Sequence, residues 1–406
     1  MRTVGLFAGI GGFELGLQRA GLELMAIAEI DPHASVVLKS RFPGVRNLGD
    51  VTRLKGLPPC DLVTAGFPCQ DLSQAGRTAG IHGSKSGLIA CALDLIEQSN
   101  RRPDWLLLEN VPFMLSLHKG AAMTWLTRRL SQLGYRWAYR VIDARAFGVS
   151  QRRRRLFILA SRAEDPANIL FADSHTSPEL NSTTSTPYGF YWTEGNRGVG
   201  WAADAVPPLK CSSGLNIASP PAIWFPGTRS IVTPTIEDAE ALQGFRRGWS
   251  RPAKTLPHGD RIRWRLVGNA VPAPVTEWIG RQLTKRYQAA TFQCVKMTPK
   301  QPWPSAGYGL DGARYGVTIS EWPVKRKQRS IMDFISPNAP ALSARATKGF
   351  YDRLIKSGLR APPRFLEDLS NHINRYADHR RLDQQENVAN KRSGQSARTR
   401  ASISAL

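Results

Sequence analysis

Short apolar runs that each end at a glycine turn or an acidic residue constrain the fold of this chain more than any other feature. The runs at 2–7, 24–28, 61–65 and 105–108 have the length of buried strands. With helices expected between them, they predict an α/β domain with an open sheet. In such sheets ligands bind beyond the carboxyl ends of the strands. The residues that follow these runs are therefore the first candidates for a functional site.

The turn after the first run, residues 7–12, is rich in glycine and leads into an expected helix. Glycines at such a turn let the backbone approach a ligand closely, beside the positive end of the helix dipole. Glu29 ends the second run about twenty residues later, at the spacing where an acid meets ribose hydroxyls. Asp50 ends a third unit. Together these residues predict a site for an adenosine-bearing cofactor, although a nicotinamide cofactor fits the glycine pattern nearly as well.

Cys69 lies in the segment Gly66-Phe67-Pro68-Cys69-Gln70, directly after the run at 61–65. Proline and glycine on its two sides suit a sharp turn that projects a thiol. A cysteine used as a small hydrophobe is the alternative, and these residues alone do not separate the two. The following polar stretch, 71–86, has the length of a functional lid.

Two further groups of polar residues are candidates for the same site. Glu109 follows three leucines, so desolvation is expected to raise its pKa toward a value useful for proton transfer; a helix cap or a salt-bridged edge acid is the alternative. An extended segment at 151–155 alternates between faces, with Gln151, Arg153 and Arg155 on one and Arg152 and Arg154 on the other. One set is expected to face the cleft and the other to face phosphates, although an arginine run is also typical of a solvated patch.

The charge of the chain indicates a polyanionic partner. Its formal net charge is +23 over 406 residues. Nucleic acid fits better than a membrane because no basic amphipathic helix and no apolar run of membrane-spanning length is evident. The chain starts with a strand rather than a signal peptide, and its five scattered cysteines lack metal-ligand spacing. We therefore expect a cytoplasmic protein without a metal site.

Changes in composition divide the chain into segments. The expected ranges are 1–162 and 229–289 for a catalytic domain, 163–228 for an inserted irregular β domain, 290–379 for a partly ordered extension and 380–406 for a basic disordered tail. Aromatic residues in the insertion suit base stacking, or they form the core of a small domain. Gly268-Asn269, expected as a turn into a helix, is another candidate binding loop. A folded module, a DNA tether and a plain disordered end remain open for the tail, and we favour the tether.

In this order, over about residues 1–285, these segments strongly resemble those of the bacterial and phage DNA (cytosine-5)-methyltransferases. The matching elements are Phe7 to Gly12, Glu29 with Asp31, Gly49-Asp50, Gly66 to Gln70, Glu109-Asn110-Val111, Gln151 with Arg153 and Arg155, Leu242 to Phe245, and Gly268 to Val271. The resemblance implies a doubly wound, Rossmann-like methyltransferase sheet and a small irregular target recognition domain at 163–228. The basic C-terminal extension after residue 290, expected from composition, lies outside the part that resembles the family. It also implies methyl transfer from S-adenosylmethionine to carbon 5 of a flipped-out cytosine in a specific sequence of double-stranded DNA.

The resemblance further implies roles for individual residues. Cys69 is the implied nucleophile that adds to carbon 6, Glu109 holds the N3 side of the base, and Arg153 and Arg155 lie near the base and the catalytic loop. The implied cofactor-binding residues are Phe7, Gly9, Gly11, Gly12, Glu29, Asp50, Leu88 and Asn269. The implied substrate and loop residues are Pro68, Gln70, Ser73 and Gln151. Double-stranded DNA is the implied partner, a cognate restriction endonuclease is a candidate second partner, and we expect a monomer.

Two positions depart from the commoner pattern of that family. Gly5 stands where many relatives have an acid, and Ala241 occupies a place usually given to arginine. Neither change removes a reacting group, so we expect an active enzyme. An RNA methyltransferase is disfavoured because no Cys-Phe-Thr element is found. A silent DNA-binding relative and a nicotinamide oxidoreductase are disfavoured by the Cys69, Glu109 and Arg153 constellation. The DNA sequence that is recognised cannot be read from residue types.

Overall fold

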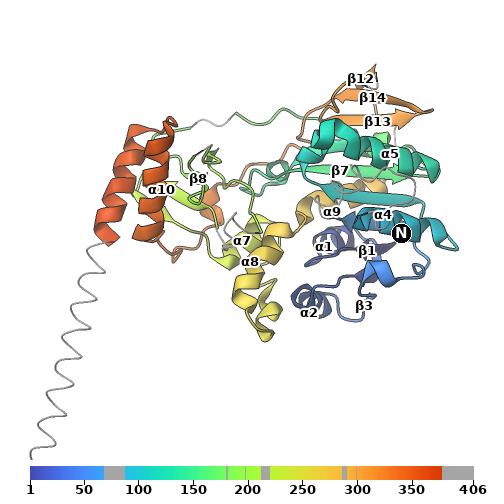
Figure 1. Ribbon diagram of the computed structural model, residues 1–406, viewed down its shortest axis with the longest axis horizontal. Coiled ribbons are helices and arrows are strands. Elements are labelled where there is room, and N and C mark those ends of the chain that lie inside the picture. The colour runs from blue at the N-terminus through green and yellow to red at the C-terminus, as the bar shows by residue number, and fades with distance from the viewer. Residues whose placement is uncertain are drawn as a thin grey trace, which may run out of the picture. The chain divides into compact units, whose positions relative to one another are not determined.

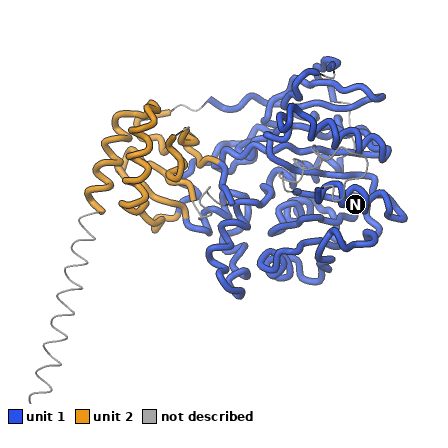
Figure 2. Tube along the Cα trace, viewed as in Figure 1, with its two compact units in different colours: residues 1–180, 208–218, 235–335 blue, residues 181–207, 219–234, 336–406 orange. Residues whose placement is uncertain are grey.

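The computed structural model describes residues 1–67, 87–179, 182–196, 198–211, 220–285, 290–298 and 300–376. These residues form two compact units (Figure 2). Unit 1 comprises residues 1–180, 208–218 and 235–335, and unit 2 comprises residues 181–207, 219–234 and 336–406, in each case as far as they are described. Within the described ranges, no helix is both long enough and apolar enough to span a bilayer.

A large mixed sheet forms the centre of unit 1 (Figure 1). Its described strands are β1 Arg2–Leu6, β2 Glu23–Ala28, β3 Arg46–Asn47, β4 Leu62–Gly66, β5 Trp105–Asn110, β6 Arg136–Asp143, β7 Arg154–Ser161, β12 Gln293–Lys296, β13 Ala306–Leu310 and β14 Ala313–Thr318. They lie in the order β12-β14-β13-β6-β7-β5-β4-β1-β2-β3. The pairs from β3 to β5 are parallel, whereas β7 is antiparallel to both β5 and β6. The carboxyl ends of β1, β2, β4 and β5 therefore meet at one edge.

Helices cover both faces of this sheet. The described α-helices of unit 1 are α1 Gly12–Arg19, α2 Pro32–Arg41, α4 Leu88–Gln98, α5 Ala121–Gln132, α6 Ala167–Leu170, α7 Ile236–Leu242, α8 Gly259–Asn269 and α9 Ala273–Leu283. One core cluster joins Leu106 and Leu108 to α4 and α5, and the other joins Leu107 to α1 and α9. Adjacent leucines of β5 thus face opposite cores, which is why the run at 105–108 is apolar throughout. The expectation of an α/β sheet with helices on both faces is confirmed.

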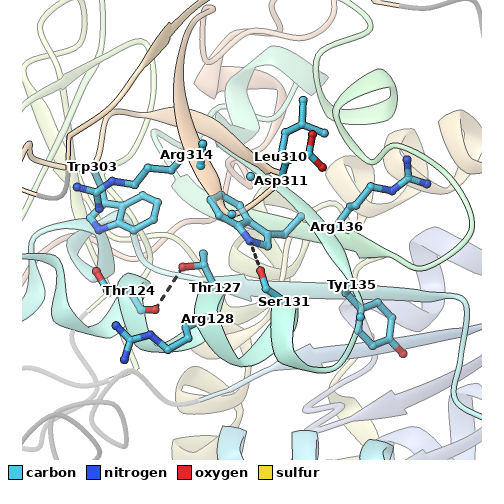
Figure 3. Close-up of a pocket in the computed structure, with 15 residues that line it drawn as sticks. Thr124, Thr127, Arg128, Ser131, Tyr135, Arg136, Trp303, Leu310, Asp311 and Arg314 are labelled. Atoms are coloured by element: carbon cyan, nitrogen blue, oxygen red, sulfur yellow. Dashed lines mark hydrogen bonds between the residues drawn. The ribbon is translucent and has the colours of Figure 1, made fainter.

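The stretch expected to be a partly ordered extension supplies three strands to this sheet. Strand β13 pairs with β6, and β14 and β12 continue the sheet beyond it. A Cβ atom at Gly309 would lie 2.4 Å from the Trp137 ring, so only a glycine lets β13 lie this close to the indole. Trp303 packs against the same indole at a centroid distance of 6.0 Å. Beside this hairpin lies a pocket of about 510 Å³ with Arg128 and Arg136 on its rim (Figure 3).

Unit 2 combines a small sheet with C-terminal helices. Its described elements are β8 Tyr188–Phe190, β9 Ala202–Ala203, β10 Ala222–Phe225, β11 Ser230–Val232, α10 Ala344–Ser357 and a helix at 363–376. Phe190 and Trp224 of the strands form one core with Phe350 and Phe365 of the helices. Asp368 accepts a hydrogen bond from the Trp224 indole at 2.9 Å. The sequence left two roles open for the aromatic residues at 163–228, base stacking or a core. For Phe190 and Trp224 the structure supports a core.

The two units do not coincide with the ranges expected from composition. Residues 163–179 belong to unit 1, and the expected extension is divided at residue 335 between the two units. The four short strands of unit 2 leave an apolar face that needs a cover, and the C-terminal helices supply it. Composition does not reveal this because the covering helices lie more than a hundred residues away in the sequence.

Candidate functional site

A cavity of about 450 Å³ opens at the edge of unit 1 where the parallel strands end. Eight residues predicted for the site line it: Phe7, Gly9, Glu29, Leu88, Glu109, Arg153, Arg155 and Asn269. Its other lining residues include Phe13, Ile30, Asp31, Asn110, Arg265 and Val271. The sequence therefore located the strand ends that line the cavity, together with Leu88 and Asn269 of helices, and did not single out Ala34 of α2 or Arg265 of α8.

The glycine-rich turn forms one end of the cavity. Phe7 and Gly9 both have positive φ angles, of 54° and 56°. A Cβ atom at Gly9 would meet no atom within 4 Å, so the backbone there borders open space. The two oxygens of Glu29 accept hydrogen bonds from the Gly9 N–H at 2.7 Å and the Asp31 N–H at 2.8 Å. Burial raises the pKa of Glu29, and these hydrogen bonds oppose the rise.

Three predicted cofactor residues do not line the cavity. A Cβ atom at Gly11 would lie 2.4 Å from the Phe42 ring, and one at Gly12 would lie 2.2 Å from the Val271 carbonyl oxygen. These glycines therefore allow close packing of the turn against its neighbours. Asp50 caps the short helical turn Val51–Arg53, where it accepts a hydrogen bond from the Thr52 N–H at 2.9 Å.

Asp31 and Arg265 connect two helices at the cavity. Asp31 caps α2 by accepting hydrogen bonds from the N–H groups of His33 and Ala34, at 2.9 and 3.1 Å. Its other carboxylate oxygen forms an ion pair with Arg265 of α8. Both residues line the cavity. Arg265 follows Asp31 by 234 positions in the sequence, so no local pattern could have paired them.

Glu109 is the acid at the other end of the cavity. Its side chain is buried, and its Oε1 lies 3.0 Å from Nε of Arg155. Burial raises the pKa of Glu109, while the positive charges of Arg155 and Arg153 act against the rise. The site therefore holds a carboxyl group that gains a proton more readily than an exposed one does.

The arginine run alternates between faces as predicted, with Gln151 and Arg153 buried and Arg152 and Arg154 exposed. Arg153 donates hydrogen bonds to the carbonyl oxygens of Leu209, Gly268 and Ala270, at 3.1, 3.0 and 2.8 Å. Gln151 donates to the Leu242 carbonyl oxygen at 3.0 Å and accepts from the Leu209 N–H at 2.8 Å. Arg154 forms an ion pair with Glu321. The buried set therefore holds the segments around the cavity together.

Asn110 fixes the point where the chain leaves β4. Its side-chain amide donates to the Phe67 carbonyl oxygen at 3.1 Å, and its oxygen accepts from the Val111 N–H at 2.9 Å. Phe67 lines the cavity and directly precedes Pro68 and Cys69 in the sequence. The predicted residues Pro68, Cys69, Gln70 and Ser73 lie outside the described residues.

Asn269 reaches the cavity from a helix end rather than from a turn into a helix. Gly268 and Asn269 are the last residues of α8, and the break before α9 falls at 270–272. A Cβ atom at Gly268 would lie 2.6 Å from the Lys210 backbone. The expected turn at Gly268-Asn269 was wrong because the pattern of 259–269 was not recognised as helical. Gly268 is needed instead for close packing of the helix against the Lys210 backbone.

Several known proteins are similar to this chain in sequence or in fold. A family model described as C-5 cytosine-specific DNA methylase matches residues 1–195. The Type II methyltransferase M2.BsuMI of Bacillus subtilis (strain 168) is 48% identical over 365 residues, which cover 87% of this chain and 93% of that relative. The Type II methyltransferase M.DsaV of Dactylococcopsis salina is 32% identical over 173 residues, which cover 42% of this chain and 48% of that relative. The solved structure of the Entamoeba histolytica methyltransferase EhMeth shares the fold, with a TM-score of 0.51, 13% identity and coverage of 70% of this chain and 97% of that one.

Proposed function

The chain belongs to the C-5 cytosine-specific DNA methylases, and on that premise we propose that it methylates carbon 5 of a flipped-out cytosine in duplex DNA, with S-adenosylmethionine as methyl donor and through a covalent Cys69 adduct. The single observation that carries the proposal is the cavity of unit 1. It joins the Gly9 and Glu29 end to the Glu109 and Arg155 end, beside the segment that leads to Cys69. One cavity thus has room for two reactants side by side.

The residues at the glycine-rich end fit the donor. The cavity volume of about 450 Å³ lies within the usual range for small-molecule sites. Phe7, Ile30 and Leu88 offer apolar surface for a purine ring, and Glu29 offers a carboxylate for ribose hydroxyls. The open space at Gly9 leaves room that any side chain would fill. S-adenosylmethionine supplies an electrophilic methyl group when it is bound.

Cytosine needs activation because its carbon 5 is a poor nucleophile. The Cys69 thiolate would form a bond to carbon 6, and the electrons of the carbon 5–carbon 6 double bond would move toward N3. Glu109 would donate a proton or hydrogen bond at N3, in keeping with its raised pKa. Carbon 5 of the resulting enamine would then accept the methyl group as its bond to the donor sulfur breaks, with S-adenosylhomocysteine as the leaving group. Loss of the carbon 5 proton to a base, release of the Cys69 thiolate from carbon 6 and return of the N3 proton to Glu109 would restore the aromatic ring.

We assign the recognition of DNA sequence to unit 2. This assignment extends the expected recognition domain to include α10 and the helix at 363–376, since both share its core. The target base is inaccessible in a stacked duplex and has to rotate out to reach the cavity. A separate small unit with polar loops suits contacts to base edges.

Methyl transfer from labelled S-adenosylmethionine to mixed-sequence duplex DNA tests the proposal, with the Cys69→Ser variant measured beside the wild type. We expect incorporation by the wild type alone, and sequencing of the methylated cytosines then gives the recognised site. Equal incorporation by Cys69→Ser would overturn the covalent mechanism. Incorporation of label into RNA but not into duplex DNA would overturn the assignment of duplex DNA as the substrate.

A further inference from the structure

We propose that a cluster of arginines around Trp249 binds a phosphate group of the DNA backbone, outside the catalytic cavity. The cluster consists of Arg41, Arg246, Arg247 and Arg251, which line an open pocket of about 530 Å³ in unit 1. It lies where the end of α2 meets the loop after α7. The proposal rests on the DNA substrate of the family and is independent of the Cys69 mechanism.

The pocket has a fixed framework. Arg41 donates from Nε to the Trp249 carbonyl oxygen at 2.8 Å and from Nη2 to the Gly248 carbonyl oxygen. Its guanidinium carbon lies 5.2 Å from the centre of the Trp249 ring, and that of Arg246 lies 5.8 Å from it. The indole N–H in turn donates to the Ile10 carbonyl oxygen at 2.7 Å. The buried Trp249 ring therefore restrains the side chains of Arg41 and Arg246. This restraint reduces the side-chain entropy that would be lost when a ligand binds.

The positive charge in this pocket is only partly neutralised. Arg247 forms an ion pair with Asp238, whereas no ion pair of Arg41, Arg246 or Arg251 occurs among the described side chains. Glu240 lies nearby, but its oxygens accept hydrogen bonds from the N–H groups of residues 248–250 and from Arg263. Glu237 also pairs with Arg263. Burial lowers the pKa of Arg41, the charges of Arg246 and Arg251 lower it further, and the charge of Glu240 acts against them. An anion in the pocket would relieve this repulsion.

The location suits a backbone phosphate of the substrate. Helix α2 begins beside Asp31 at the cavity and ends at Arg41, a length of about 15 Å for ten residues at the usual helical rise. A duplex carries one phosphate charge for about every 1.7 Å of its axis, so phosphates recur within that distance of a bound target base. The planar fork of arginine also matches phosphate oxygens well. We therefore favour DNA over an acidic protein as the partner.

Salt-dependent binding to mixed-sequence duplex DNA tests this site without requiring catalysis. The test variant is Arg246→Ala with Arg251→Ala, which leaves the hydrogen bonds of Arg41 in place. Arg128→Ala, at an exposed arginine of α5 outside the cluster, is the control for the loss of one positive charge elsewhere on unit 1. Fluorescence anisotropy at several salt concentrations gives the slope of log K against log salt. We expect the slope to become shallower by about 0.9, the contribution of the one phosphate that the double variant no longer neutralises.

The double variant is also expected to keep the wild-type melting temperature and cofactor affinity, because it changes only exposed charges. An unchanged slope, or one equal to that of Arg128→Ala, would overturn the proposal. A third outcome is that inorganic phosphate raises the melting temperature of the wild type but not of the double variant, while the two proteins have the same slope of log K against log salt. The pocket then binds a free anion and not DNA. A wild type that binds DNA in this way and yet transfers no methyl group would contradict the proposed function and leave this site intact.

Discussion

Glu109 and Arg155 face each other from two antiparallel strands, with Nε of Arg155 3.0 Å from Oε1 of Glu109. The register of β5 and β7 places Asn110 opposite Leu156, so the two side chains leave their strands at the same edge of the sheet. Burial raises the pKa of Glu109 and Arg155 opposes that rise. Two neighbouring cations therefore influence the protonation of this carboxyl group, Arg155 more strongly than Arg153.

The Glu109→Gln variant should lose the proton donor and keep the shape of the side chain. We expect kcat to fall by about 10²–10⁴-fold, the usual contribution of a positioned acid. Binding of duplex DNA and of the cofactor should change little, because the amide still fits the cavity. Single-turnover methyl transfer and anisotropy measure the two quantities. A kcat within about twofold of the wild type would remove Glu109 from the proton transfer.

The Arg155→Ala variant should shift the pH dependence of methyl transfer. Without the cation the pKa of Glu109 rises further, since Arg155 acts to lower it. If the protonated carboxyl is the active form, activity falls as pH rises through this pKa, and the variant keeps its activity to higher pH. The profile of kcat against pH measures the shift. A descending limb that stays in place or moves to lower pH would contradict the assignment.

Arg353 of α10 should influence DNA recognition from the C-terminal part of unit 2. Its guanidinium donates to the carbonyl oxygens of Trp192 and Glu194, at 2.7 and 3.0 Å, and so holds the glycine-rich loop after β8. For Arg353→Ala we expect kcat/KM for DNA to fall about tenfold, or about 1.4 kcal/mol, with relaxed site choice and unchanged cofactor affinity. Arg345→Ala, at an exposed position of the same helix, is the control. If Arg353→Ala and the wild type methylate the same sites, the loop after β8 takes no part in recognising the DNA sequence.

Glu14 should make stability depend on pH. Its carboxyl group is buried without a hydrogen-bond partner in the described structure, and burial raises its pKa to about 8. Between its ordinary value of 4.5 and 8, the folded chain holds a proton that the unfolded chain has released. Stability therefore falls as pH rises through this window, by at most about 1.4 kcal/mol per pH unit. Glu14→Gln should unfold at a higher temperature than the wild type near pH 8 and at a similar temperature near pH 5. If the unfolding temperatures of the two proteins depend on pH in the same way, the Glu14 carboxylate has a partner that stabilises its charge.

Much of unit 1 could be predicted from the sequence because local patterns in the sequence determine where its strands form. A run such as 105–108 is apolar at every position because the strand is buried on both faces, and its end places Glu109 at the cavity. The alternation along 151–155 likewise follows from the geometry of an extended chain. The glycine-rich turn and Glu29 were found through their spacing.

Other features depended on tertiary interactions that no local pattern encodes. The ion pair of Asp31 with Arg265 and the cover that residues 344–376 give to unit 2 join segments far apart in the sequence. Gly5 was noted in the sequence only as a departure from its relatives. In the structure a Cβ atom at Gly5 would lie 1.9 Å from Oε1 of Glu14, so the glycine provides the space that the buried carboxyl occupies. The sequence determines where strands and turns form because those depend on periodicity, whereas the partners of buried charges are decided by which distant segments pack together.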